Sequence, residues 1–178
     1  MNAPMERVLP VTREVVRILL RRKERIVLAE SCTAGMLCAL LGQIPGVSEC
    51  LCGSFVTYRP EAKKDWLGVG SQVIAKHTTE SIEVAEEMAR GALVECTEAD
   101  WAIAIVGHLG PDAPVDQDGK IYVCIARYAD GTPAIYQRIE HVLGSHERTH
   151  RQRDAAEFVL SQFGRCLVQE MEAGCEQN

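Results

Sequence analysis

A serine stands where a short apolar run gives way to small polar residues. Residues 26–29 read IVLA, Ser31 lies in the segment ESCTAG that follows, and another apolar stretch begins at Met36. The pattern predicts a buried strand, a turn and a buried helix. Such a turn exposes its central side chain beside free N–H groups at the helix start. Ser31 is therefore a candidate nucleophile for acyl transfer, with those N–H groups holding the oxyanion. A serine that only caps the helix fits the same pattern.

A serine nucleophile needs a base, and the chain offers a lysine for that role. No Gly-x-Ser-x-Gly motif is present, so the usual hydrolase elbow is not indicated. Lys63 and Lys64 follow the β-rich segment 54–58, SFVTY. A lysine accepts a proton when burial lowers its pKa, although most lysines lie on solvated surfaces. Tyr58 ends that segment, and it either relays a proton or orients the lysine, or packs at the edge of the core.

Helical and strand patterns alternate along the chain, and a pair of strands comes late. Helices are expected over residues 11–20, 36–41, 61–67, 81–96 and 147–171, and strands over 26–29, 54–58, 101–106, 121–126 and 134–139. Residues 107–119 hold three Gly, two Pro and three Asp, which predicts a loop. The order of elements predicts an α/β fold in which one mixed sheet carries helices on both sides.

Charge and hydropathy exclude several classes of partner. The 178 residues have a net charge of −6 and no basic block, so neither nucleic acid nor a membrane surface is an expected partner. No apolar run approaches the roughly 20 residues of a membrane helix. Residues 1–20 mix charged with apolar side chains, which argues against a secretory leader and predicts a cytoplasmic protein.

The cysteine count is high, but the spacing fits no metal motif. No C-x-x-C pair and no Cys/His spacing typical of zinc occurs, so no metal site is predicted. Several of the cysteines lie in apolar periodic segments, where a free thiol behaves as a small hydrophobic group. We expect reduced structural thiols at Cys32, Cys38, Cys50, Cys52, Cys96, Cys124, Cys166 and Cys175.

Several short motifs occur in a fixed order. They are residues 30–35 (ESCTAG), 45–48 (PGVS), 55–63 (FVTYRPEAK), 67–69 (LGV), 81–92 (SIEVAEEMARGA) and 102–111 (AIAIVGHLGP). Together they resemble the CinA C-terminal domain family, over about residues 11–168. The resemblance implies a three-layer α/β/α sandwich and a single domain over 1–178, with a core of about 11–170 and short tails. It also implies homodimers or larger homo-oligomers.

The resemblance further implies an activity. Family members are similar to nicotinamide-nucleotide amidases, which convert nicotinamide mononucleotide to nicotinate mononucleotide and ammonia without a metal or organic cofactor. Ser31 matches the nucleophile, Lys63 rather than Lys64 matches the base, and Tyr58 matches the motif tyrosine. A Ser–Lys pair is an attested nucleophile–base arrangement. The substrate-binding positions are then Thr33, Gly35, Gly46, Ser48, Val106, Gly107 and Arg148.

The sequence departs from the family pattern at several places, including the second half of the loop at residues 112–120. Ala34 replaces a glycine, which is a mild change unless the position needs a positive φ. Val106 stands where the family has Ser or Thr, so we expect a pocket wall that lacks a hydroxyl. The Gly-Asp-Arg motif is absent, and either His146 or Arg148 occupies the place of its phosphate-binding arginine. Arg148 is favoured because helix register resists insertions and a guanidinium matches phosphate geometry, although a solvated arginine fits as well.

Three functions remain open at this point. The first is an amidase acting on nicotinamide mononucleotide, with weakened activity because of Val106. The second is a catalytically silent domain that binds a nucleotide or regulates. The third is an amidase acting on another small amide.

Overall fold

The computed structural model describes residues 10–175 of the chain, with side chains up to residue 172. The predicted tails and the side chain of Cys175 lie outside this part. The helices are α1 (Pro10–Arg22), α2 (Met36–Gly42), α3 (Pro60–Leu67), α4 (Ser71–His77), α5 (Ile82–Glu95) and α6 (Arg148–Cys175), with a short 3₁₀ turn at Val47–Glu49. The strands are β1 (Ile26–Glu30), β2 (Leu51–Val56), β3 (Trp101–Gly107), β4 (Lys120–Ala129) and β5 (Thr132–Val142).

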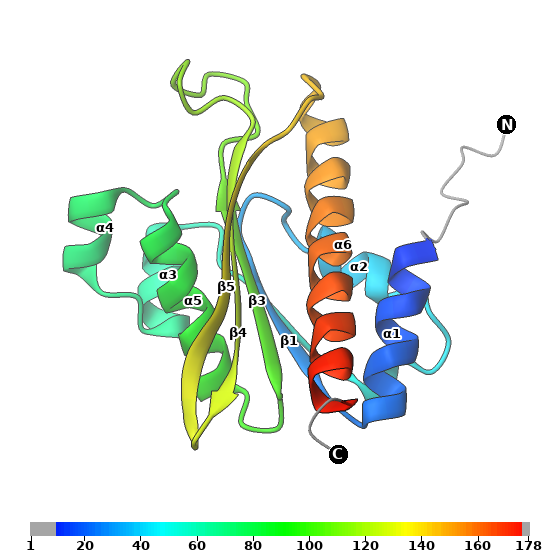
Figure 1. Cartoon of the computed structure of the whole chain (residues 1–178). Helices are drawn as coiled ribbons and strands as arrows, with labels where there is room; N and C mark the ends of the chain where they lie inside the picture. Colours follow the sequence, from blue (N-terminus) through cyan, green and yellow to red (C-terminus); the bar gives the residue numbers. More distant parts are fainter. Residues whose placement is uncertain (1–9, 176–178) are drawn as a thin grey trace, which may run out of the picture.

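One mixed sheet forms the middle layer of a single α/β domain (Figure 1). Its strand order is β2-β1-β3-β4-β5. β1 runs parallel to both β2 and β3, whereas β4 is antiparallel to both β3 and β5. Helices α1, α2 and α6 cover one face, and α3, α4 and α5 cover the other. The predicted mixed sheet with helices on both sides is confirmed.

The central strand β3 shows why the sheet has two covered faces. Successive side chains of a strand point to opposite faces, so an unbroken apolar run buries both. Trp101, Ile103 and Ile105 join the core beneath α1 and α6, whereas Ala102, Ala104 and Val106 join the core beneath α5. The residues of the second set are smaller, which lets α5 approach the sheet closely.

The connections that follow β1 and β2 run to opposite faces of the sheet. From β1 it enters α2 on one face, and from β2 it enters α3 on the other. In α/β proteins such a change of direction opens a crevice beyond the carboxyl ends of the strands. Ser31 directly follows β1, and Tyr58 comes two residues after β2, so both candidate residues lie at this crevice.

β4 and β5 extend beyond their predicted bounds, and the predictions for two further elements fail in other ways. β2 was expected at 54–58 but spans Leu51–Val56, which leaves Tyr58 outside the strand. Gly53 hid the strand start, because glycine is depleted in strands. Helix α4 was not predicted, and none of its residues is buried; it therefore lacks the apolar stripe by which helices are recognised. No helix in the part of the chain that the structure describes is long and apolar enough to span a bilayer.

Candidate active site

Lys63 and Ser31 are in direct contact. The Lys63 Nζ donates to Ser31 Oγ over 2.8 Å and to the carbonyl of Thr57 over 2.9 Å. The first turn of α3, which begins with Pro60, directs Lys63 inward, and its side chain is fully buried. The predicted contact is confirmed, although the catalytic roles of the two residues stay predictions. Lys64, the alternative lysine, does not make this contact.

Burial changes the proton affinity of this lysine. Desolvation lowers the pKa of Lys63 below its ordinary value, and the nearby carboxylate of Glu80 partly offsets that change. No carboxylate within the described residues forms a salt bridge with Lys63. A lysine in this state releases its proton more readily than a solvated one, which a general base requires.

The thiol next to Ser31 is a poor competitor as nucleophile. Cys32 is buried, and desolvation raises the pKa of its thiol to about 12. The thiolate is the reactive form of cysteine, so Cys32 stays protonated and unreactive near neutral pH. Of the two adjacent side chains, Ser31, which contacts a lysine of lowered pKa, is therefore the stronger candidate nucleophile.

A buried carboxylate occupies the start of α2. Glu30, the last residue of β1, is fully buried and accepts five hydrogen bonds. Its donors are Thr33 Oγ1 (2.7 Å), the N–H groups of Gly35, Leu37 and Cys38 (3.0 Å each) and Ser54 Oγ (3.1 Å). The prediction that N–H groups of the helix start hold the oxyanion is therefore wrong, because Glu30 already uses them. Thr33 and Gly35, predicted to bind substrate, serve Glu30 instead.

Another backbone N–H group lies beside Ser31. Within the described residues, no oxygen accepts a hydrogen bond from the N–H of Cys32, and Cys32 lines the same pocket as Ser31. The amide of the residue after the nucleophile is a recurrent oxyanion donor in serine hydrolases. The turn itself thus supplies the donor that the helix start does not.

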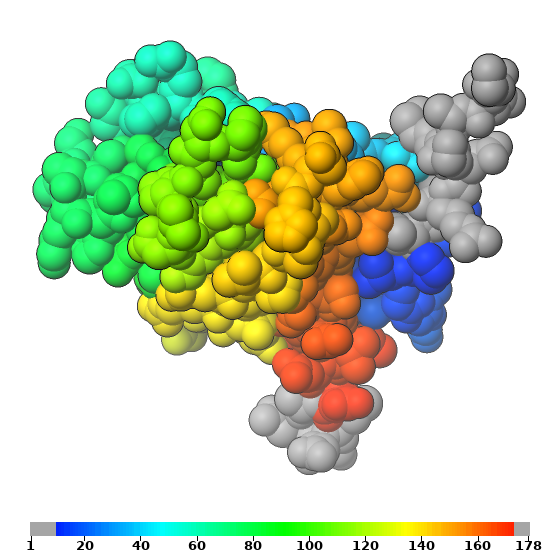
Figure 2. Space-filling model, turned by 90° about the horizontal axis from the view of Figure 1, so that it is seen from above, coloured from blue at the N-terminus to red at the C-terminus, as the bar shows by residue number. Residues whose placement is uncertain are grey.

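Ser31 opens into a pocket of about 200 Å³. The pocket is bordered by Tyr58, Glu80, Arg148 and residues 107–113, which form the end of β3 and the loop after it. A neighbouring hollow of about 530 Å³ shares Arg148 and residues 110–113 with it. Figure 2 shows the loop after β3 beside the start of α6 on this end of the molecule. The small pocket and the larger hollow are therefore adjacent, and Arg148 borders both.

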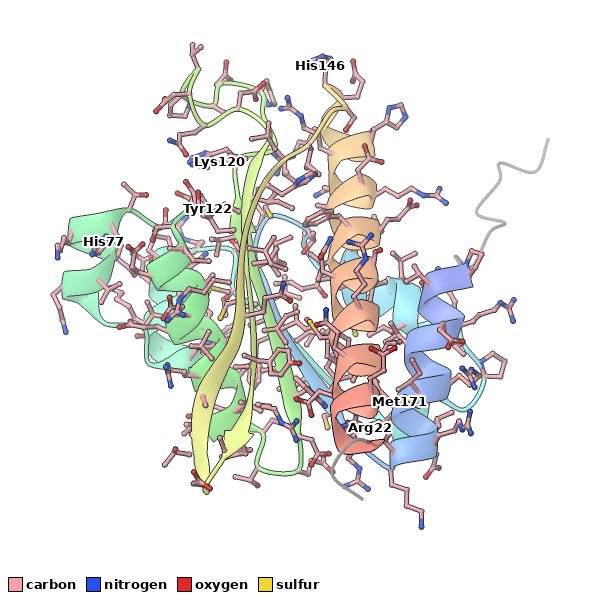
Figure 3. The ribbon with its side chains drawn as sticks, viewed as in Figure 1. Arg22, His77, Lys120, Tyr122, His146 and Met171 are labelled. Carbon is pink, nitrogen blue, oxygen red and sulfur yellow. The ribbon has the colours of Figure 1, made fainter. Side chains whose placement is uncertain are left out.

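Arg148 faces the pocket, as predicted. Its guanidinium donates to the Tyr58 hydroxyl over 2.7 Å and to the carbonyl of Gly110. His146, the competing residue, does not line the Ser31 pocket but borders the neighbouring hollow, at the tip of the turn before α6 (Figure 3). Of the two alignments, the structure supports the one that places Arg148 near Ser31.

Three other predicted substrate contacts do not face the pocket. Val106 is fully buried in the core beneath α5 and does not line the pocket, so the expected wall position is wrong. Gly46 and Ser48 precede β2, whereas Ser31 follows β1, its parallel neighbour. They therefore lie at the opposite end of the sheet. Gly107, by contrast, lines the pocket as predicted.

Comparisons with known proteins agree with this architecture. The model of the CinA C-terminal domain matches residues 9–167. The chain belongs to the CinA C-terminal domain family. A CinA-like protein of Myxococcus xanthus (strain DK1622) is 35% identical over 136 residues, which cover 75% of this chain and 31% of that protein. The chain thus spans about a third of the length of this curated relative.

Solved structures of CinA-type proteins have the same fold. The competence damage-inducible protein A of Klebsiella pneumoniae superposes with a TM-score of 0.80 at 28% identity, over 89% of this chain and 95% of that one. The competence/damage inducible protein of Agrobacterium tumefaciens superposes with a TM-score of 0.82 at 26% identity, over 94% of this chain and 99% of that one.

Three features of this CinA domain were missed or underrated from sequence. Ala34 has a φ of 52°, so the replacement of the family's glycine is not mild; alanine in the left-handed region is strained. Glu80 borders the Ser31 pocket, yet nothing in its local sequence marks it as a site residue. Glu30 was within the quoted motif, and a carboxylate ending an apolar strand just before a helix was the available signal.

Proposed function

We propose that this CinA domain is an amidase that hydrolyses the carboxamide of nicotinamide mononucleotide, giving nicotinate mononucleotide and ammonia. The observation that carries the proposal is the 2.8 Å hydrogen bond between Lys63 Nζ and Ser31 Oγ. A fully buried lysine of lowered pKa on a serine hydroxyl is the arrangement that activates a nucleophile. The family resemblance supplies the substrate.

The chemistry follows from the positions of these groups. Neutral Lys63 takes the proton of Ser31 as Oγ attacks the carboxamide carbon, and the N–H of Cys32 donates to the oxyanion that forms. Lys63 then gives the proton to the departing nitrogen, which leaves as ammonia. Water hydrolyses the resulting ester of Ser31, with Lys63 again as base, and releases the carboxylate.

Arg148 is the residue we assign to the phosphate. It borders both the Ser31 pocket and the larger hollow, and a guanidinium binds phosphate through paired hydrogen bonds. Its present acceptors are the Tyr58 hydroxyl and the Gly110 carbonyl, so Tyr58 orients Arg148. We assign Tyr58 this positioning role rather than a proton relay, because the hydroxyl is engaged by Arg148 and not by Lys63.

The test is release of ammonia from nicotinamide mononucleotide by the purified protein. Ser31→Ala and Lys63→Arg are each expected to lower kcat by at least about 100-fold, since removal of a general base costs that much or more and arginine stays protonated. Lys64→Ala is the matched control and should keep activity near the wild-type value. Binding of the mononucleotide without ammonia release would contradict the proposal and favour a silent binding domain, and release from other amides alone would point to a different substrate.

A further inference from the structure

Two thiols and a carboxylate meet at the end of the sheet opposite Ser31. Cys52 lies near the start of β2, Cys96 ends α5, and Glu98 follows it. Their sulfur and oxygen atoms all lie within 4.8 Å of one another. Both cysteines are half-buried and Glu98 is exposed, so the group can be reached from solvent. None of these residues takes part in the proposed amidase chemistry.

A break in the strand pairing places Cys52 in this group. Ile26 pairs with Leu51 and Val27 pairs with Gly53, so Cys52 is an extra residue in β2. Such bulges are rare between parallel strands and redirect a side chain. The Cys52 side chain packs on the α5 face of the sheet, as Cys96 does. The bulge therefore brings together two thiols that are far apart in the sequence, which is why no cysteine spacing predicted this site.

We propose that Cys52, Cys96 and Glu98 bind a zinc ion, with water as the fourth ligand. Zinc prefers four ligands in a tetrahedron, at about 2.3 Å from sulfur and about 2.0–2.2 Å from oxygen. Ligand atoms on such a tetrahedron lie roughly 3.5–3.8 Å apart, which the observed separations allow with small side-chain rotations. Two thiolates with one carboxylate suit zinc rather than magnesium or calcium, which prefer oxygen ligands.

The surrounding charges suit a divalent cation. A bound zinc ion would displace both thiol protons to solvent. Two thiolates, one carboxylate and Zn²⁺ carry a net charge of −1, which Arg25 balances through its 3.0 Å ion pair with Glu98. Zinc here would fasten the edge strand β2 to the end of α5.

The experiment titrates Zn²⁺, and Co²⁺ as a spectroscopic substitute, into reduced, chelator-treated protein. One equivalent should bind, Co²⁺ should give thiolate-to-metal charge-transfer absorption, and Zn²⁺ at about 100 times Kd should raise Tm by roughly 5–10 °C. Cys52→Ser and Cys96→Ser should abolish the absorption. Glu98→Gln, which changes only an exposed side chain, should weaken binding at least 10-fold while the protein stays folded. Cys38→Ser, a half-buried thiol on α2, is the matched control and should bind normally.

The outcomes separate this proposal from the amidase proposal. Ammonia release by the wild-type protein should be equal with and without Zn²⁺, because the zinc ligands lie at the other end of the sheet. Unchanged absorption in Cys52→Ser would overturn the zinc site. Failure to bind Co²⁺ would overturn it as well. If peptide mass spectra after mild oxidation then show a Cys52–Cys96 disulfide, the two thiols form a redox couple instead.

Discussion

The buried Lys63 Nζ donates to the Ser31 hydroxyl over 2.8 Å, and this contact joins the turn after β1 to the first helix after β2. Because those two connections run to opposite faces of the sheet, the residues meet only in the crevice between them. The relation explains why a lysine and a serine 32 positions apart in the sequence can act as one unit.

The lowered pKa of Lys63 predicts a pH dependence of activity. Only neutral Lys63 accepts the Ser31 proton, so kcat should rise with pH through the folded-state pKa, which lies below 10.5. A profile of kcat against pH for the wild-type protein measures this rise. A limb at or above the ordinary lysine pKa would contradict the assigned base.

The same shift affects stability, with a definite sign. Between the folded-state pKa of Lys63 and its unfolded value near 10.5, the unfolded chain binds more protons, so the free energy of unfolding rises with pH in that window. Lys63→Met is expected to remove this rise. Urea unfolding of both proteins at several pH values in the window checks it, and equal pH slopes would show that the lysine pKa is unshifted.

Glu30→Gln should destabilise the Ser31 turn. The amide keeps one acceptor oxygen but places an NH₂ group against N–H donors, and hydrogen bonds to a charged acceptor contribute about 1.5–3 kcal/mol each. We expect a loss of about 2–4 kcal/mol in the free energy of unfolding, measured with urea. Ser54→Ala, which removes only one of the five bonds, is the control and should cost about 1.5 kcal/mol, the lower end of that range. A loss for Glu30→Gln no larger than for Ser54→Ala would show that the cluster is not cooperative.

Ala34→Gly should stabilise the protein. Ala34 has a φ of 52°, where the alanine Cβ costs about 1–2 kcal/mol and glycine costs little. Because glycine also gives the unfolded chain more freedom, the net gain should be about 0.5–1 kcal/mol, or roughly 1–4 °C in Tm. Thermal unfolding measures it, with Ala39→Gly in the interior of α2 as a control of opposite sign. Destabilisation by Ala34→Gly would show that the turn does not strain Ala34.

Apolar patterns predicted the core, but they could not assign faces to functional residues. The run at 101–106 predicted β3, found at Trp101–Gly107. Strand alternation would also have placed Val106 on the same face as Ala104, away from the pocket. The site prediction for Val106 followed the family motif instead. The site predictions for Gly46 and Ser48 were wrong for a similar reason, since a sequence motif does not show at which end of the sheet its residues lie.

Other residues gave no usable signal in the sequence. Glu80 reaches the pocket because the connection between α4 and α5 passes beside the loop after β3, where it lies 3.9 Å from His108. That approach depends on tertiary packing between distant segments. The bulge at Cys52 is likewise a property of strand pairing, and it cannot be read from residue types.

The burial of Val106 predicts that Val106→Thr lowers stability without improving activity. Its side chain is fully buried in the core beneath α5, so a threonine hydroxyl there would lack a partner and cost about 1–3 kcal/mol. The free energy of unfolding should fall by that amount, and kcat/KM for the mononucleotide should not rise. Val106→Ala, which removes volume without adding a polar atom, separates the hydroxyl effect from packing. A several-fold gain in kcat/KM for Val106→Thr would return this residue to the pocket wall.

Glu80→Gln should change both the preference for a cationic over a neutral substrate ring and the pH profile of kcat. Arg148 brings a positive charge to the pocket, and Glu80 and Asp112 are the carboxylates that border it. The pyridinium ring of nicotinamide mononucleotide is cationic, so loss of one carboxylate should lower kcat/KM about 5-fold, or about 1 kcal/mol. The reduced mononucleotide has a neutral ring, so its kcat/KM should fall less than about 2-fold.

Because Glu80 raises the pKa of Lys63, the Glu80→Gln substitution should also move the acid limb of kcat to lower pH. Glu83→Gln, on the first turn of α5 and outside the pocket, is the control. Equal losses of kcat/KM for the oxidised and the reduced mononucleotide, with an unchanged acid limb of kcat, would show that Glu80 contributes only to packing.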